Sequence, residues 1–364
     1  MTGRIIIGAD IVPTALNTDR FIVGDKTALI GEELSEIFDR ADYRVFNLEV
    51  PLTDKGAPIL KSGPNLIAPK ATAFGYKALG IDALSVANNH TLDQGRDAFV
   101  ETLDLLCENG IAHFGGGRTE EEVKKPLLLP LCKKMVGIVS FCEHEFSWYE
   151  DYGVGARGFD PLCSLDEITE LSSEVDYLVV MYHGGREHFR YPSPNLQRVC
   201  RRMVDHGADL VLCQHSHCVG AGEIYKGAEI VYGQGNALFF YEKRSDDCWF
   251  TGTVLELTCE DGRFRTKHYP IERHGVGVRL SHNPEILEGY KRRSAEIAED
   301  GFVKRHYKEF VGQNASVAIE HLSRLGEALS NVGKKESAAA RNLLTCDPHR
   351  ELLIEYLVKI NELY

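Results

Sequence analysis

The sequence lacks the features that mark membrane and secreted proteins. No stretch contains the roughly 18 consecutive apolar residues needed to span a bilayer. The apolar residues 5–7 are followed at once by Gly-Ala-Asp, which does not fit a secretory signal peptide. The ten cysteines, scattered from Cys107 to Cys346, do not have the spacing of a disulfide framework. We therefore expect a cytoplasmic protein without a membrane segment and with reduced thiols.

An excess of positive charge is also lacking. The chain has 41 Lys and Arg residues against 54 Asp and Glu residues, a net charge of −13. This balance argues against a nucleic-acid-binding surface and against a general attraction for polyanions. An anionic small-molecule or polymer substrate would therefore have to be held locally, by a metal and a few arginines. With 364 residues the chain is long enough for one large α/β domain and an appendage.

Five segments with the apolar pattern of buried β-strands each end in a potential metal ligand. Ligands of α/β sheets collect where strands end, and imidazole, carboxylate and amide oxygen together suit zinc, manganese or iron. Polar residues are common at strand ends, so each position alone has an ordinary structural explanation. The repeated ligand type is what favours one or two divalent metal ions. The residues at these strand ends are Asp10, Asn47, Glu49, Asn88, Asn89, His90, His183, His215 and His217.

The remaining pattern is that of an α/β protein with a helical appendage. Apolar periodicity predicts crossover helices over residues 96–109 and 195–206, and alternating segments over 223–271 predict antiparallel strands that complete a second sheet. Beyond about residue 284 the pattern is helical and charged, and residues 334–337 are the expected linker. These helices fit either a cap packed on the core or a dimerisation element, which would make the protein a homodimer.

At the strand ends the sequence resembles the bacterial CapA family, the proteins of poly-γ-glutamate capsule synthesis. The matching motifs follow the family's order: NLEVPLT at 47–53, ANNHTLDQG at 87–95, HGGRE at 183–187, GADLV at 207–211, HSH at 215–217 and GN at 235–236. The resemblance implies a variant of the calcineurin-like metallophosphoesterase fold, an α/β sandwich of two sheets flanked by helices. We expect this domain over residues 1–275 and a helical C-terminal extension over 284–364.

The resemblance also implies roles for individual residues. His90 would be the catalytic acid or the group that stabilises a phosphate, while Asn88, Arg186 and Glu187 would contact the substrate. An exposed salt bridge is an equally good explanation for Arg186. The implied metal ligands are Asp10, Glu49, Asn89, His183, His215 and His217.

The chain departs from the pattern of these families at three places. Val12 stands where the phosphoesterase superfamily usually has the His of a D-x-H motif, so one of two metals would lose an imidazole. Gly184 follows the first His, where the capsule family commonly has Trp. Gln214 and Ser216 replace a His before the H-x-H motif and a Pro within it. The first departure puts a full two-metal centre in question, and the others indicate an altered substrate pocket.

Two functions fit these observations. The first is a metal-dependent hydrolase that uses a metal-activated hydroxide on a phosphoester, or on an anionic polymer such as polyglutamate. The second is a non-catalytic accessory protein of poly-γ-glutamate capsule synthesis or export, in which a degraded metal site binds polymer or stabilises the fold. The absence of His at position 12 favours the second, and the retained His90 and H-x-H motifs favour the first.

Overall fold

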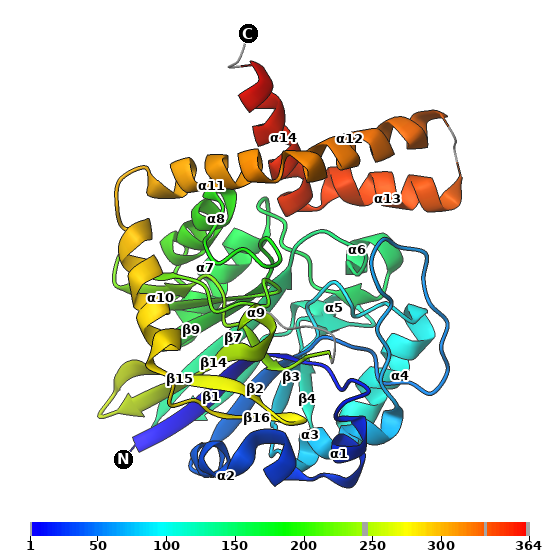
Figure 1. Ribbon diagram of the computed structural model, residues 1–364. Helices are drawn as coiled ribbons and strands as arrows, with labels where there is room; N and C mark the ends of the chain where they lie inside the picture. The colour runs from blue at the N-terminus through cyan, green and yellow to red at the C-terminus, as the bar shows by residue number, and fades with distance from the viewer. Residues whose placement is uncertain (1, 242–246, 331–332, 362–364) are drawn as a thin grey trace.

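Two β-sheets packed face to face form the centre of the molecule in the computed structural model, which describes residues 2–241, 247–330 and 333–361 (Figure 1). The first sheet has the strand order β16-β15-β14-β1-β2-β3-β4, with β13 also paired to β1. Its strands β1 to β4 are parallel, whereas β14 runs antiparallel to β1. The bounds are β1 (Thr2–Ile11), β2 (Tyr43–Leu48), β3 (Ala83–Ser85), β4 (Ala112–Phe114), β13 (Asn236–Leu238), β14 (Thr251–Glu260), β15 (Arg263–His274) and β16 (Gly277–Leu280).

The second sheet has the order β11-β12-β10-β9-β7-β6, and a small third sheet pairs β5 with β8. In the second sheet β7, β9, β10 and β12 are parallel, and the two edge strands are antiparallel to their neighbours. The bounds are β5 (Gly116–Gly117), β6 (Leu127–Leu131), β7 (Lys134–Cys142), β8 (Gly155–Ala156), β9 (Tyr177–His183), β10 (Leu210–Gln214), β11 (Gly222–Tyr225) and β12 (Ala228–Val231).

Both faces of β1 are buried, which explains its continuous apolar run. Ile5 and Ile7 pack between the sheets against residues such as Met181 and Leu212, while Ile6 points to the opposite face and packs with the flanking helices. This alternation gives three apolar layers, one between the sheets and one outside each sheet. The predicted fold class, a two-sheet α/β sandwich flanked by helices with a helical C-terminal extension, is confirmed.

Helices cover the outer face of each sheet. The apolar layer outside the first sheet includes residues of α1 to α4, and the layer outside the second includes residues of α7 and α8. The expected helices 96–109 and 195–206 correspond to α4 and α8. The bounds are α1 (Thr18–Val23), α2 (Lys26–Asp39), the 3₁₀ helix η1 (Lys70–Thr72), α3 (Ala73–Ala78), α4 (Gly95–Glu108), α5 (Glu120–Lys124), α6 (Tyr149–Tyr152), α7 (Ser164–Glu174), α8 (Pro194–Asp205) and α9 (Asp247–Phe250).

Two predictions about the second half of the chain were wrong. The antiparallel segments of residues 223–271 do not complete one sheet: β11 and β12 extend the second sheet, whereas β14 and β15 extend the first. An alternating pattern specifies that a strand has two faces and does not specify its partner. Residues 334–337 are not a linker but begin a helix, since Lys and Glu are good helix formers and Gly333 caps it.

In the described residues of the C-terminal extension there are five helices, and the last of them gather at one end of the molecule (Figure 1). Here α12 and α13 lie side by side and α14 rises from them. Within the described ranges none of the helices combines the length and apolar character required to cross a bilayer. The homodimer expected through this extension stays a prediction. The bounds are α10 (Pro284–Ile297), α11 (Phe302–Gln313), α12 (Ala315–Ser330), α13 (Lys334–Thr345) and α14 (Asp347–Asn361).

Candidate metal centre and its pocket

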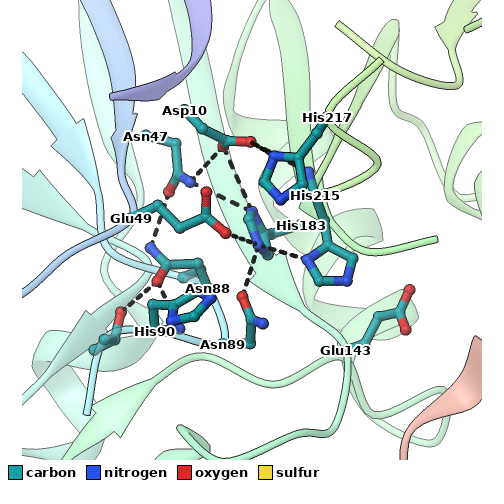
Figure 2. A network of polar contacts seen from close by, with 12 residues as sticks. Asp10, Asn47, Glu49, Asn88, Asn89, His90, Glu143, His183, His215 and His217 are labelled. Carbon is teal, nitrogen blue, oxygen red and sulfur yellow. Dashed lines mark hydrogen bonds and ion pairs between the residues drawn. The ribbon is translucent and has the colours of Figure 1, made fainter. Parts of the chain in front are cut away.

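The carboxyl ends of strands from both sheets meet at one buried cluster. Asp10 lies near the end of β1 and Glu49 directly follows β2, both in the first sheet; His183 ends β9, and His215 and His217 follow β10 in the second. Figure 2 shows these five side chains pointing toward one another, and all are at most 6% exposed. The site therefore lies across the sandwich, and both sheets contribute to it.

One nitrogen of His183 lies at the centre of the first ligand group. Its Nε2 is 3.2 Å from Glu49 Oε1, 3.0 Å from Asn89 Oδ1 and 3.2 Å from His215 Nδ1. Metal bonds of about 2.0–2.2 Å place neighbouring donors roughly 3–4 Å apart, so these separations fit a shared ion. On the other side of the ring, Nδ1 is 3.7 Å from Asp10 Oδ1 and 3.3 Å from the side-chain amide nitrogen of Asn47.

A second ligand group shares Glu49 with the first. The donor atoms of Asp10, Glu49 and His217 lie within 4.8 Å of one another, as do those of Glu49, His183 and His215. Glu49 is therefore the residue common to both groups. The first group has two imidazoles and the second only one, so their donor sets are unequal.

Glu49 provides the test of whether these residues fit a cation. Its carboxylate is fully buried, and neither oxygen accepts a hydrogen bond from the described residues. Burial raises the pKa of Glu49 to about 8, and burial together with the Glu49 charge raises the pKa of Asp10 to about 7. Buried carboxylates without hydrogen bonds are unfavourable unless a cation compensates them. The residues therefore fit a divalent metal.

The imidazoles in the cluster have the protonation state that a metal requires. Burial lowers the pKa of His183 to about 4 and that of His217 to about 3, and it also lowers the pKa of His215. Neutral imidazole binds metals, whereas imidazolium does not. All three rings therefore present lone pairs at neutral pH.

The backbone around the H-x-H motif is strained. His215 and His217 have φ angles of 76° and 55°, in the left-handed region that residues other than glycine rarely adopt. Such conformations cost about 1–3 kcal/mol each and are concentrated at functional sites, where the surrounding structure holds them. Trp249 stacks on the His217 ring at 4.4 Å, and Asn236 Oδ1 lies 2.9 Å from His217 Nδ1.

His90 lies beside the cluster and is held by an acidic partner. Its Nδ1 is 2.6 Å from Asp93 Oδ2, and Lys61 forms an ion pair with the same carboxylate. Because a carboxylate accepts, Nδ1 is the donor and Nε2 remains available on the other side of the ring. His90 lines a cavity of about 330 Å³ together with Asn89 and His215.

The three residues expected to contact substrate lie in different surroundings. The Asn88 side chain is fully buried and donates to Asn47 Oδ1 and to the Leu48 carbonyl, while its Oδ1 accepts from the His90 backbone N–H. It therefore shapes the loop that presents Asn89 and His90. Arg186 and Glu187 line the cavity.

The departures noted in the sequence have structural counterparts. Val12 is 2% exposed and belongs to the apolar layer outside the first sheet. A Cβ atom on Gly184 would collide with the Glu143 side chain, which accepts a hydrogen bond from the Gly185 N–H. Gln214 donates to the Gly8 carbonyl and so links the two sheets. The space beside His183 is thus filled by Glu143, which Figure 2 shows apart from the ligand cluster.

Sequence reasoning did not assign a positioning role to several residues that hold the ligands in place. Asn47 donates to Asp10 Oδ1 at 2.7 Å, and Lys61, Asp93, Asn236 and Trp249 position His90 or His217 as described. Asn47, Asp93 and Asn236 lie inside the motifs 47–53, 87–95 and 235–236, and this placement was a usable signal. Lys61 and Trp249 lie outside every motif.

Comparisons with known proteins identify the family of this chain and several relatives. Residues 1–241 match the family described as bacterial capsule synthesis protein PGA_cap. The chain belongs to this family. Within the PGA_cap family it is 27% identical over 218 residues to the PGA biosynthesis protein CapA of Bacillus subtilis, covering 58% of this chain and 56% of that protein. It is 26% identical over 233 residues to a Mycobacterium tuberculosis protein described as a probable polyglutamine synthesis accessory protein, covering 58% and 60%.

The chain therefore spans little more than half the length of these curated PGA_cap relatives. Among solved structures, a Staphylococcus aureus protein assigned as a 5'-nucleotidase has a TM-score of 0.50 at 12% identity, covering 80% of this chain and 58% of that one. This likeness supports the fold alone. The family match ends at residue 241, before the C-terminal helices begin.

Proposed function

We propose that the protein is a metal-dependent hydrolase of an anionic substrate, either a phosphoester or a γ-linked glutamate chain. The observation that carries the proposal is the shared Glu49: two ligand groups overlap on a buried carboxylate whose oxygens accept no hydrogen bond from the described residues. A site built only to stabilise the fold would have its carboxylate oxygens paired by protein donors.

The ligand groups suggest how the site would work. We assign Asn89, His183, His215 and Glu49 to one ion, and Asp10, Glu49 and His217 to the other. Divalent ions held there supply Lewis-acid chemistry, lowering the pKa of water and neutralising charge that develops on the substrate. The choice among manganese, zinc and iron is left to experiment, since the donor set suits each.

The chain's own residues supply the remaining steps. The bond from His90 Nδ1 to Asp93 fixes the ring and directs Nε2 toward the cavity, where it can hold or transfer a proton at the leaving oxygen. Arg186, on the cavity wall, can pair with an anionic group of the substrate. Asn88 keeps the loop of Asn89 and His90 in place through its buried hydrogen bonds.

The experiment is an activity screen with metal-defined protein. Protein loaded separately with manganese, zinc and iron is tested on an activated phosphomonoester, an activated phosphodiester and a γ-glutamate oligomer. We expect turnover of at least one substrate class, which chelator abolishes and metal restores. Failure to hydrolyse all three classes with all three metals would overturn the proposal.

A non-catalytic accessory role is the second candidate. Val12 is buried among apolar side chains and leaves the second ligand group with a single imidazole, which favours weak metal binding at that position. The similarity to a relative described as an accessory protein points the same way. Binding of a γ-glutamate oligomer without any turnover in the same screen would support this candidate.

A further inference from the structure

The last helices of the chain form a roof over the cavity beside the metal cluster. Residues of α12, α13 and the start of α14 line the cavity together with Asn89, His90 and His215. We call this set the roof; it consists of His321, Arg324, Asn342, Cys346 and His349. All five lie beyond residue 241, where the family match ends.

The roof is attached to the core at several points. Asn342 Nδ2 lies 3.3 Å from Ser62 Oγ, and the Cys346 thiol lies 3.4 Å from Glu145 Oε1. An apolar cluster joins residues of α11, α12 and α14 to Phe189, just after the HGGRE motif. These contacts hold the helices against the loops that carry the site, so the roof is part of the pocket.

Two buried polar atoms of the roof are left without a partner. His321 is 8% exposed and Asn342 is 5% exposed, and both line the cavity. Neither Nδ1 of His321 nor Oδ1 of Asn342 has a hydrogen-bond partner in the described part of the chain. Leaving a buried polar group unsatisfied costs about 1–3 kcal/mol, so such groups at a cavity wall point to a polar ligand.

The cavity gathers cationic side chains in a protein of net charge −13. Arg186 and Arg324 line it together with Lys61, against the carboxylates of Glu145 and Glu187. Arg186 Nη1 is 3.4 Å from His349 Nδ1, which holds the guanidinium toward the roof. The planar guanidinium group is suited to phosphate and carboxylate.

The size of the cavity limits what can enter. Its volume of about 330 Å³ lies at the lower end of the range for ligand pockets. A long polymer needs an extended groove, whereas here residues of α12 to α14 line the same pocket as Asn89 and His215. A small molecule with an anionic group fits both the volume and the charge.

We propose that the C-terminal roof makes this a site for a small ligand bearing a phosphate or carboxylate group, which His321, Arg324 and Asn342 recognise. The proposal rests on the proposed function for the reacting end of the ligand, because the proposed metal ligands Asn89 and His215 line the same pocket. It assigns substrate selection to helices outside the family match.

The test uses a pair of substitutions that break the same ion pair. Arg324 is paired with Glu320 one turn earlier on α12, and Glu320 does not line the cavity. Arg324→Ala removes the pair and the pocket charge, whereas Glu320→Ala removes only the pair. Arg324→Glu reverses the charge. Binding of inorganic phosphate, γ-glutamyl-glutamate and long poly-γ-glutamate is measured by calorimetry on full-length protein, with manganese and after chelation.

We expect phosphate or the dipeptide to bind, with affinity roughly three- to tenfold weaker in Arg324→Ala and weaker still in Arg324→Glu. Glu320→Ala should bind as well as the unmodified protein or better. If inorganic phosphate binds, the recognised group is a phosphate; if the dipeptide binds, it is a carboxylate. Equal weakening in Arg324→Ala and Glu320→Ala, or tighter binding of the long polymer than of the dipeptide, would overturn the proposal. The chelated samples distinguish failure of this proposal from failure of the proposed metal site. The charge of Arg324 persists without metal, so its effect on binding should remain after chelation.

Discussion

Replacing Glu49 by Gln should have opposite effects on the metal-free and the metal-loaded protein. Burial raises the pKa of Glu49 from 4.5 to about 8, so at pH 7 folding of the metal-free protein must either protonate this group or bury its charge. The 2.5 pH units between 4.5 and 7, at 1.36 kcal/mol per unit, correspond to a cost of about 3 kcal/mol. Gln has nearly the same shape and no charge, so it removes this cost.

The sign of the pH dependence follows from the direction of the shift. Because the folded-state pKa lies above the unfolded value, the cost is absent below about pH 4.5 and grows as the pH rises toward 8. Metal-free Glu49→Gln should therefore be more stable than the unmodified protein at pH 7 by up to about 3 kcal/mol, and nearly equal at pH 4.5. Urea denaturation of chelator-treated samples at both pH values measures this difference.

Metal should reverse the order. Manganese at about 1,000 times its dissociation constant should stabilise the unmodified protein by about 4 kcal/mol, and should stabilise Glu49→Gln far less. Glu143→Gln is the matched control, because Glu143 is also buried with a raised pKa but lies outside both ligand groups. The control should keep the full metal response. A full manganese response in Glu49→Gln, or lower stability of its metal-free form at pH 7, would refute the reasoning.

Three further predictions concern the residues around the ligands. If the protein is a hydrolase, His90→Ala should reduce turnover by at least about 100-fold. Its metal content, measured by elemental analysis, should stay nearly unchanged. A matching loss of metal would show that His90 is a ligand. His217→Ala should lose turnover and part of the metal together, and full metal retention would exclude it from the ligand groups. Gly184→Ala should lower the midpoint of thermal unfolding, because its Cβ collides with the buried Glu143 side chain. In the double variant, Glu143→Ala should relieve that loss. An unchanged midpoint in Gly184→Ala would show that the loop adapts.

The strands and their polar ends could be predicted from the sequence because both depend on local pattern. The apolar run of β1 and the residues that follow β2, β3, β9 and β10 identify strand ends directly. Their convergence follows from the fold that the motifs imply. Partner choice is different: the alternation of β11 and β14 does not tell which sheet each joins, and this part was predicted wrongly.

The roof could not be predicted because it depends on tertiary packing. Periodicity predicts that residues beyond 284 are helical, and it does not say where these helices dock. His321 and Arg324 lie more than a hundred residues from the H-x-H motif in the sequence and join its pocket only through the packing of α12 to α14. Lys61 was missed for the same reason, since its loop reaches His90 across the fold.

The most direct test of the two-ion site is metal content followed by chelator titration of the purified, metal-loaded protein. Two overlapping groups with unequal donors predict two metal equivalents that leave in two separate steps. The ion assigned to Asp10, Glu49 and His217 should leave first, because it has one imidazole against two. Protein that retains no metal after loading, or that releases all of its metal in a single step, would contradict the account.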